Sequence, residues 1–237
     1  METRIFKDNE ATARAFAQFL KEKTIGNKSL SIALSGGSTP KALFKILATD
    51  YKNEIDWSNL HFYWGDERMV APDHEESNYK MTYDLLFSQL PIPKANIHRI
   101  RGENTLKDEV TRYAEEIDLN LPKANGLPVF DIIMLGMGAD GHTASIFPPD
   151  LHLIGDKGIC AIGTNPESGQ KRVTLTGPVI NNARHICFLV TGIGKSEKID
   201  EIFNKKGEFE SYPAAHIVPK NGSITWFLDE SASSKLN

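Results

Sequence analysis

Apolar residues follow two alternating spacings along this chain. Short runs such as 129–135 and 184–190 are apolar almost throughout, and between such runs lie longer stretches in which apolar residues recur every three or four positions. Continuous apolar runs are typical of strands buried on both faces of a sheet, and the second spacing is typical of amphipathic helices. The alternation predicts an α/β fold, a Rossmann-like and mostly parallel sheet with helices on both faces.

The same pattern gives the expected elements approximate bounds. We expect helices at 9–23, 40–48, 78–88, 105–121 and 194–203. We expect strands at 29–34, 60–64, 96–100, 129–135, 159–162, 172–176, 184–190 and 223–228, the last of which closes the sheet. Segment 150–170 is rich in glycine, aspartate and proline and is expected to be a small excursion or active-site flap, and residues 231–237 are expected to fray.

Size and charge narrow the class of protein. We expect one domain over residues 1–237. The formal charge is 27 − 31 = −4, which argues against nucleic acid as a main partner. No run of about 18 apolar residues and no apolar signal core occur, so no membrane partner is expected. On these grounds we expect a cytoplasmic protein that is a monomer or a weak homo-oligomer.

The two cysteines point to buried thiols. Cys160 and Cys187 each lie within an apolar run, and no Cys-x-x-Cys spacing occurs. We therefore expect reduced side chains, with no metal and no cofactor.

A glycine-rich turn after the run 129–135 carries the most informative chemistry. The turn ends in Asp140, Gly141 and His142. Open α/β sheets place their chemistry at the carboxyl ends of strands, and histidine titrates near neutral pH. We expect His142 to be a general base, with a packed histidine at a helix start as the alternative.

The turn also matches a dinucleotide-binding fingerprint. Gly136, Gly138 and Gly141 have the required spacing. That fingerprint needs a long helix after the third glycine and an acid at the end of the next strand. Pro148 and Pro149 interrupt any such helix, and the run at 158–162 is followed by no acid. Binding of NAD is therefore disfavoured.

A second glycine-rich turn follows the run 29–34. Gly36 and Gly37 expose backbone N–H groups, Ser38 and Thr39 add hydroxyl groups, and a helix starts here. These features predict an anion site suited to a phosphate, because a helix N-terminus carries partial positive charge. The alternative is a plain strand-to-helix turn with a hydroxyl cap.

Two cations are candidates for the same phosphate. Arg172 starts one strand and Lys195 follows another. Gly194, Lys195 and Ser196 resemble the end of a P-loop, but Leu189 stands where that motif needs its first glycine, so a nucleotide triphosphate loop is excluded. A solvated lysine is the alternative for Lys195.

Three charged residues, Asp66, Glu67 and Arg68, follow the strand expected at 60–64. Arg68 could bind a carboxylate or stabilise an oxyanion, and Asp66 could be a second acid or base; an ion-paired loop is the alternative. His74, Glu75 and Glu76 fit a solvated loop better than a metal site. Five other histidines are expected to be structural or surface residues: His61, His98, His152, His185 and His216.

Taken together, these segments resemble the 6-phosphogluconolactonase family within the glucosamine-6-phosphate isomerase/deaminase-like superfamily. The matching segments are 35–40, 65–68, 76–78, 135–148, 172–176 and 194–195, in order along almost the whole chain. The resemblance implies hydrolysis of 6-phospho-D-glucono-1,5-lactone, a phosphosugar lactone of the oxidative pentose phosphate pathway, without a metal.

The resemblance also implies roles for the candidate residues. His142 would activate water, Asp140 would orient His142, and Arg68 would bind the sugar or the developing oxyanion. The phosphate would be held by Gly36, Gly37, Ser38, Arg172 and Lys195.

Two alternatives remain on this fold. Deaminases of the superfamily carry a glutamate five residues after the histidine, where this chain has Phe147, so ring-opening chemistry would lose a proton-handling group. A non-catalytic phosphosugar sensor would lack the base, whereas Asp140 and His142 are both present.

Overall fold

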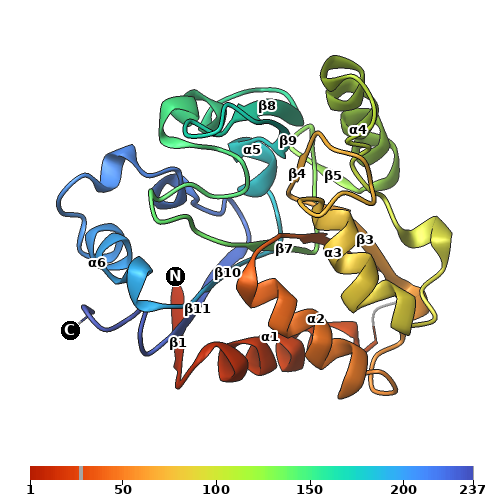
Figure 1. Ribbon diagram of the computed structural model, residues 1–237, viewed down its shortest axis with the longest axis horizontal. Helices are drawn as coiled ribbons and strands as arrows, with labels where there is room; N and C mark the ends of the chain where they lie inside the picture. Colours follow the sequence, from red (N-terminus) through yellow and green to blue (C-terminus); the bar gives the residue numbers. More distant parts are fainter. Residues whose placement is uncertain (27–28, 237) are drawn as a thin grey trace.

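Six parallel strands form the central layer of the protein (Figure 1). The computed structural model describes residues 1–26 and 29–236. The spatial order of the strands is β1-β11-β10-β7-β2-β3. Their bounds are β1 (Glu2–Phe6), β2 (Leu30–Leu34), β3 (Leu60–Trp64), β7 (Ile132–Leu135), β10 (His185–Val190) and β11 (Ser223–Asp229). Every pair of neighbours is parallel, which confirms the predicted sheet.

Helices cover both faces of this sheet, as predicted. On β11, Trp226 and Phe227 are neighbours in sequence and therefore point to opposite faces. Phe227 contacts Phe16 of α1 (Asn9–Thr24), whereas Trp226 contacts Phe203 of α6 (Ser196–Asn204). The layer with α1 continues through α2 (Ser38–Thr49) and α3 (Asn78–Leu85). No helix in the described ranges is long and apolar enough to span a membrane.

A smaller antiparallel sheet lies above the carboxyl ends of the central strands. It contains β4 (Asp66–Arg68), β9 (Lys171–Leu175) and β8 (Cys160–Thr164), and α4 (Leu106–Asn120) packs against it. The expected strands at 159–162 and 172–176 thus exist, but they belong to this second sheet. The expected excursion 150–170 provides β8 as well as the end of a 3-10 helix at Pro148–Ile154.

The remaining elements are short. α5 (Gly177–Ile180) is a single turn, and β5 (Lys123–Ala124) pairs with β6 (Leu127–Pro128). Further 3-10 helices lie at Trp57–Asn59, Phe87–Gln89, Lys94–Asn96, Ile193–Lys195, Phe209–Ser211 and Pro213–His216.

Three expectations about individual elements are wrong. Residues 96–100 form no strand: Asn96 ends a 3-10 helix, and of the residues after it only Ile97 makes a single bridge, to Phe62. β11 does not close the sheet, because β1 pairs along its outer side. Of the expected frayed tail, residues 231–236 form hydrogen-bonded turns after β11. Ser233 is buried there and its hydroxyl donates to the Asp229 carbonyl; Asn237 lies outside the described residues.

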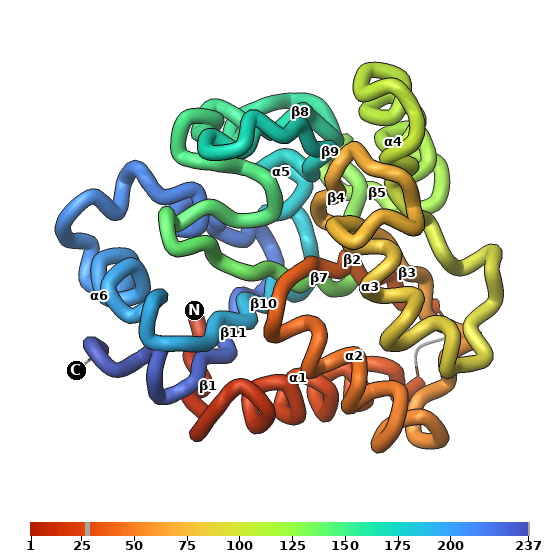
Figure 2. Tube along the Cα trace, viewed as in Figure 1, coloured from red at the N-terminus to blue at the C-terminus, as the bar shows by residue number. Residues whose placement is uncertain are grey.

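The chain reverses its direction of strand addition between β2 and β7. These two strands are neighbours, yet β3 follows β2 on one side and β10 and β11 follow β7 on the other. In Figure 2 the trace leaving β2 turns into α2, whereas the trace leaving β7 runs out on the side of α6 before it loops back to the segment that precedes β8. Asp131 accepts hydrogen bonds from the Ser31 N–H and hydroxyl at 2.8 and 2.9 Å, which ties the two strands at their amino ends. Open α/β sheets bind ligands at such a reversal, outside the carboxyl ends of the strands.

Candidate active site

A cavity of about 250 Å³ opens at the carboxyl ends of β2, β7 and β10. It brings together segments that lie more than 150 residues apart in the sequence, from Ser35 to Lys195. Of the ten predicted site residues, nine line it: Gly36, Gly37, Ser38, Thr39, Asp66, Arg68, His142, Arg172 and Lys195. The tenth, Asp140, lies directly behind His142.

One wall of the cavity is the turn between β2 and α2. Gly37 stands just before α2 with a φ of +115°, a conformation that favours glycine, and no side chain caps the helix. A Cβ atom on Gly36 would lie 2.0 Å from Oδ1 of Asn78, so the backbone there approaches α3 closely. The first N–H groups of α2 therefore face the cavity without a capping side chain.

Thr39 contributes to this wall mainly through packing. Its hydroxyl is 2.8 Å from that of Thr191, which follows β10, and Thr39 itself is buried. The hydrogen bond joins the turn after β2 to the turn after β10. Ser38 is exposed and has no such commitment within residues 1–26 and 29–236.

The opposite wall holds Asp140 and His142. Nδ1 of His142 lies 2.6 Å from Oδ1 of Asp140, and the His142 backbone N–H donates to the same oxygen at 3.1 Å. Burial acts to raise the pKa of Asp140, but the hydrogen bonds and charge of His142 outweigh it and hold that pKa below its ordinary value. With Nδ1 turned to the carboxylate, Nε2 is the ring nitrogen left to act on a ligand.

Glycine at position 138 makes room for this pair. The Gly138 N–H donates to the His142 carbonyl at 2.9 Å, so the turn folds back on itself. A Cβ atom on Gly138 would lie 2.1 Å from Nδ1 of His142 and 2.4 Å from Oδ1 of Asp140. The turn that holds Asp140 and His142 therefore requires glycine at position 138 for a steric reason.

The chain after Gly141 does not have the form of a dinucleotide-binding fold. Thr143 and Ile146 make an isolated bridge, the Thr143 hydroxyl donates to the Gly136 carbonyl, and a 3-10 helix starts only at Pro148. Within the described chain no long helix follows the third glycine, in agreement with the sequence argument against NAD.

Arg172 reaches the cavity from β9 and is held by buried polar groups. Its Nη1 lies 3.9 Å from Oδ2 of Asp66, and that same carboxylate oxygen accepts a hydrogen bond from the Ser145 hydroxyl at 2.6 Å. Burial lowers the pKa of Arg172, although Asp66 acts in the opposite direction. Asp66 thus faces a cation and a hydroxyl group, and both contacts are made by the same carboxylate oxygen.

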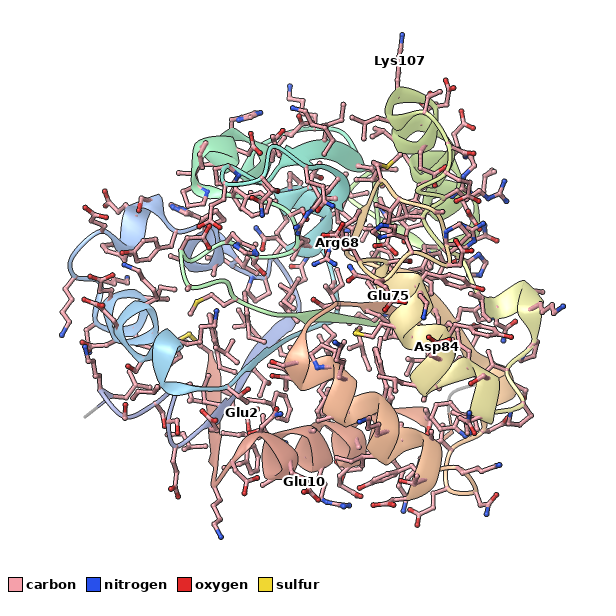
Figure 3. The ribbon with its side chains drawn as sticks, in the orientation of Figure 1. Glu2, Glu10, Arg68, Glu75, Asp84 and Lys107 are labelled. Carbon is pink, nitrogen blue, oxygen red and sulfur yellow. The ribbon has the colours of Figure 1, made fainter. Side chains whose placement is uncertain are left out.

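Arg68 is the last residue of β4 and is labelled near the centre of the view in Figure 3. Its Nη1 donates to the Glu76 carbonyl at 2.5 Å. Among the described residues, neither its buried Nε nor that of Arg172 has a hydrogen-bond partner. Two guanidinium groups thus bring uncommitted donors to one cavity, which suits an anionic ligand.

Lys195 is half-buried at the mouth of the cavity, just before α6. Burial lowers its pKa, and the nearby charge of Asp140 acts to raise it. The cavity therefore has three cationic side chains, Arg68, Arg172 and Lys195, against one lining carboxylate, Asp66.

Glu67, between two site residues, is not itself part of the cavity lining. Its carboxylate is buried and accepts hydrogen bonds from the Ser77 hydroxyl and from the N–H groups of Asn78 and Tyr79. Burial raises its pKa despite these donors. Glu67 therefore fixes the start of α3 beside the cavity.

Three polar residues of the site have no assigned role in the sequence analysis. Asn78 lines the cavity and donates to the Asp66 carbonyl at 3.0 Å, Thr191 lines it beside Thr39, and Ser145 holds Asp66. Asn78 follows the helix cap Ser77, and Thr191 follows the buried strand β10. These positions at element ends are the sequence signal that could have indicated both residues.

Phe147 lies between the two ends of the site. Its ring centroid is 4.5 Å from that of His142, and Cζ of Arg172 lies over the Phe147 ring at 5.5 Å from the same centroid. This residue occupies the position of the deaminase glutamate. An apolar side chain there contacts both His142 and Arg172.

Comparison with known proteins gives consistent matches over nearly the whole chain. The family model described as glucosamine-6-phosphate isomerases/6-phosphogluconolactonase matches residues 7–226. A 6-phosphogluconolactonase of Haemophilus influenzae is 49% identical over 207 residues, or 87% of each chain. The solved structure of the devB protein has a TM-score of 0.96 at 45% identity and covers 100% of this chain and 99% of its own. That of the Trypanosoma brucei 6-phosphogluconolactonase has a TM-score of 0.87 at 29% identity, with 100% and 98% covered.

Proposed function

Because the chain belongs to the glucosamine-6-phosphate isomerase/6-phosphogluconolactonase family, we propose that it hydrolyses 6-phospho-D-glucono-1,5-lactone to 6-phospho-D-gluconate. This reaction is a step of the oxidative pentose phosphate pathway. The resemblance drawn from the sequence motifs is confirmed at the level of the family. The observation that carries the proposal is the 2.6 Å contact of Asp140 with His142 in a cavity with three cations.

His142 is the general base of the proposed reaction. Nε2 takes a proton from water while the water oxygen attacks the lactone carbonyl, and a C–O bond forms. The tetrahedral oxyanion then collapses, the ring C–O bond breaks, and the proton on Nε2 passes to the departing ring oxygen. Asp140 keeps the proton on Nδ1 and stabilises the imidazolium that forms.

The cations supply binding and electrostatic stabilisation. The substrate phosphate lies against the first turn of α2, at Gly36, Gly37 and Ser38, with Arg172 and Lys195 as counter-charges. Arg68 binds the sugar or the developing oxyanion. Anchoring the phosphate fixes the carbonyl near Nε2, which contributes to rate through positioning.

Asp66 is better suited to holding Arg172 than to transferring protons. Its Oδ2 accepts from the Ser145 hydroxyl and faces Arg172, so this oxygen is engaged by two partners of the protein itself. We therefore assign it as a positioning residue in place of the second acid or base considered from the sequence.

We further propose that the protein works in the cytoplasm. Cys160 and Cys187 are buried free thiols, which suits a reducing cytoplasm.

The test is hydrolysis of freshly generated 6-phosphogluconolactone, coupled to 6-phosphogluconate dehydrogenase. Spontaneous hydrolysis is subtracted, and wild type is compared with His142→Ala. A rate above background that is lost in a folded variant supports both the reaction and the base. A folded wild type without enhancement overturns the proposal, and thermal stabilisation by 6-phosphogluconate in that case indicates a sensor.

A further inference from the structure

A second hollow continues outward from the catalytic cavity, between α2 and α3. Its volume is about 490 Å³. The two spaces share one wall, because four residues line both of them: Gly37, Ser38, Arg68 and Asn78. We call the outer space the α2–α3 groove. Figure 3 shows Arg68 above Glu75 and the beginning of α3, with Asp84 further along that helix.

Two lysines of α2, Lys41 and Lys45, line this groove. They are four residues apart and therefore lie on one face of the helix. Both are exposed, and neither has an ion-pair or hydrogen-bond partner for its side chain within residues 1–26 and 29–236. The groove is also lined by Lys80 and by three carboxylates, Glu75, Glu76 and Asp84. Lys80 pairs with Asp84 at 2.7 Å and Glu75 at 3.6 Å, so the acidic residues belong to α3 and the segment before it, and the unpaired lysines to α2.

This arrangement is unfavourable for the helix itself. Like charges four residues apart destabilise a helix by about 0.2–0.5 kcal/mol. A cation near the N-terminus opposes the helix dipole, and α2 has no acidic residue in its first turn. Helix stability therefore does not account for Lys41 and Lys45.

The two lysines offset the repulsion between a negatively charged protein and an anionic substrate. The formal charge is −4, which repels a sugar phosphate carrying two negative charges at neutral pH. A cleft lined with positive charge raises the local concentration of an anion and its rate of association. On the α2 side of the groove, Lys41 and Lys45 place such charge outside the cavity and next to it.

We propose that the α2–α3 groove is the entry route for the substrate phosphate, and that Lys41 and Lys45 draw the anion through it to the N-terminus of α2. This inference rests on the proposed function for the identity of the substrate. It assigns the two lysines to capture of the anion and leaves the chemical step to the cavity residues.

The test compares two charge-reversed variants. In Lys41→Glu/Lys45→Glu the charge at these two positions of the groove is reversed. Glutamate is a good helix former, so α2 should stay folded. In the control, Lys107→Glu/Lys220→Glu, the global charge changes equally. Lys107 points away from the protein at the start of α4 (Figure 3), and Lys220 lies before β11, at the amino ends of the strands. A third variant, Lys41→Arg/Lys45→Arg, retains the groove charge.

Steady-state hydrolysis is measured over a series of salt concentrations. At low ionic strength we expect kcat/KM of the groove variant to fall about fivefold or more below that of the control, with kcat unchanged. The difference should shrink as salt rises, because screening shortens the Debye length to about 10 Å at 0.1 M. The arginine variant should match wild type.

Failure of this inference differs from failure of the proposed function. If wild type hydrolyses the lactone and both charge-reversed variants have equal kcat/KM and salt slopes, the entry route is overturned. If wild type does not hydrolyse the lactone, the same variants are compared by calorimetry with 6-phosphogluconate. A weaker, salt-dependent Kd in the groove variant alone then supports anion capture, and equal Kd values overturn it.

Discussion

The ring of Phe147 packs against the ring of His142, with their centroids 4.5 Å apart. Phe147 is buried, and the guanidinium of Arg172 contacts the same ring. One apolar side chain therefore contacts both the proposed base, His142, and a proposed phosphate-binding residue, Arg172.

Phe147→Leu should impair the reaction more than its effect on stability explains. Leucine keeps an apolar side chain but loses the cation–π contact, and we expect kcat/KM to fall about tenfold. The matched control is Phe130→Leu, a buried ring that contacts Tyr63 and lies outside the cavity lining. Both variants should lower Tm to a similar extent, measured by thermal unfolding. Equal kcat/KM values for the two would contradict the role of Phe147.

Gly138→Ala should inactivate the enzyme, whereas Gly136→Ala should not. The new Cβ at position 138 would overlap His142 and Asp140, but at position 136 its nearest neighbour is the Ser35 hydroxyl oxygen at 3.9 Å. Displacement of the base by about 1 Å typically costs about 10²-fold in rate. The coupled lactone assay on both variants checks this, and comparable activity in the two would show that the steric argument is wrong.

Asp140→Asn should lower kcat about 10²-fold or more with little change in KM. Asparagine retains the size of Asp140 but not the charge that stabilises the imidazolium, and Asp140 is outside the cavity lining. Since its pKa is held below the ordinary 3.8, Asp140 stays charged in wild type at any higher pH. The kcat and KM profiles from pH 5 to 8 provide the measurement. A change confined to KM would assign Asp140 to substrate binding.

Glu116→Gln should reduce the acid sensitivity of folding. Burial acts to raise the pKa of Glu116, but His98 at 2.9 Å and Arg112 outweigh it, so the pKa lies below its ordinary 4.5. A lowered carboxyl pKa stabilises the fold above the unfolded-state value, and this contribution is lost as pH falls through the folded-state value. With allowance for solvent screening we expect about 1 kcal/mol.

The measurement for Glu116 is urea unfolding at pH 7 and pH 3.5. Glu116→Gln should be less stable than wild type at pH 7, and the gap should narrow at pH 3.5. Glu115→Gln, an exposed neighbour, is the control. A gap that is constant with pH would rule out the proposed linkage.

The central sheet was predictable where burial is complete. β7 and β10 are buried almost throughout and are read directly from their continuous apolar runs. β1 was missed because it is an edge strand with an exposed Ile5, and it is defined by pairing with β11. Residues 96–100 have apolar residues at strand-like spacing, but Ile97 and Ile100 pack from an irregular segment.

The candidate site was predictable where local sequence sets the geometry. The turns at 36–39 and 138–142 depend on glycines and on neighbours within a few residues. Ser145 depends on Asp66, 79 residues away, and the Thr39–Thr191 contact spans 152 residues. Such contacts exist only once the strands are in order, so a polar residue in a single sequence does not identify them.

The hydrogen bonds of Asp131 to Ser31 have a consequence for the time course of folding. They join residues 100 apart, and β2 and β7 share only the registered pairs Ile32–Ile132 and Ala33–Ile133. Closing a loop of that length is an entropic barrier that local helix formation does not face. The turn after β2, proposed to hold the phosphate, and the turn after β7, which carries His142, lie on opposite sides of this closure. On refolding from denaturant, catalysis should therefore return later than helical circular dichroism.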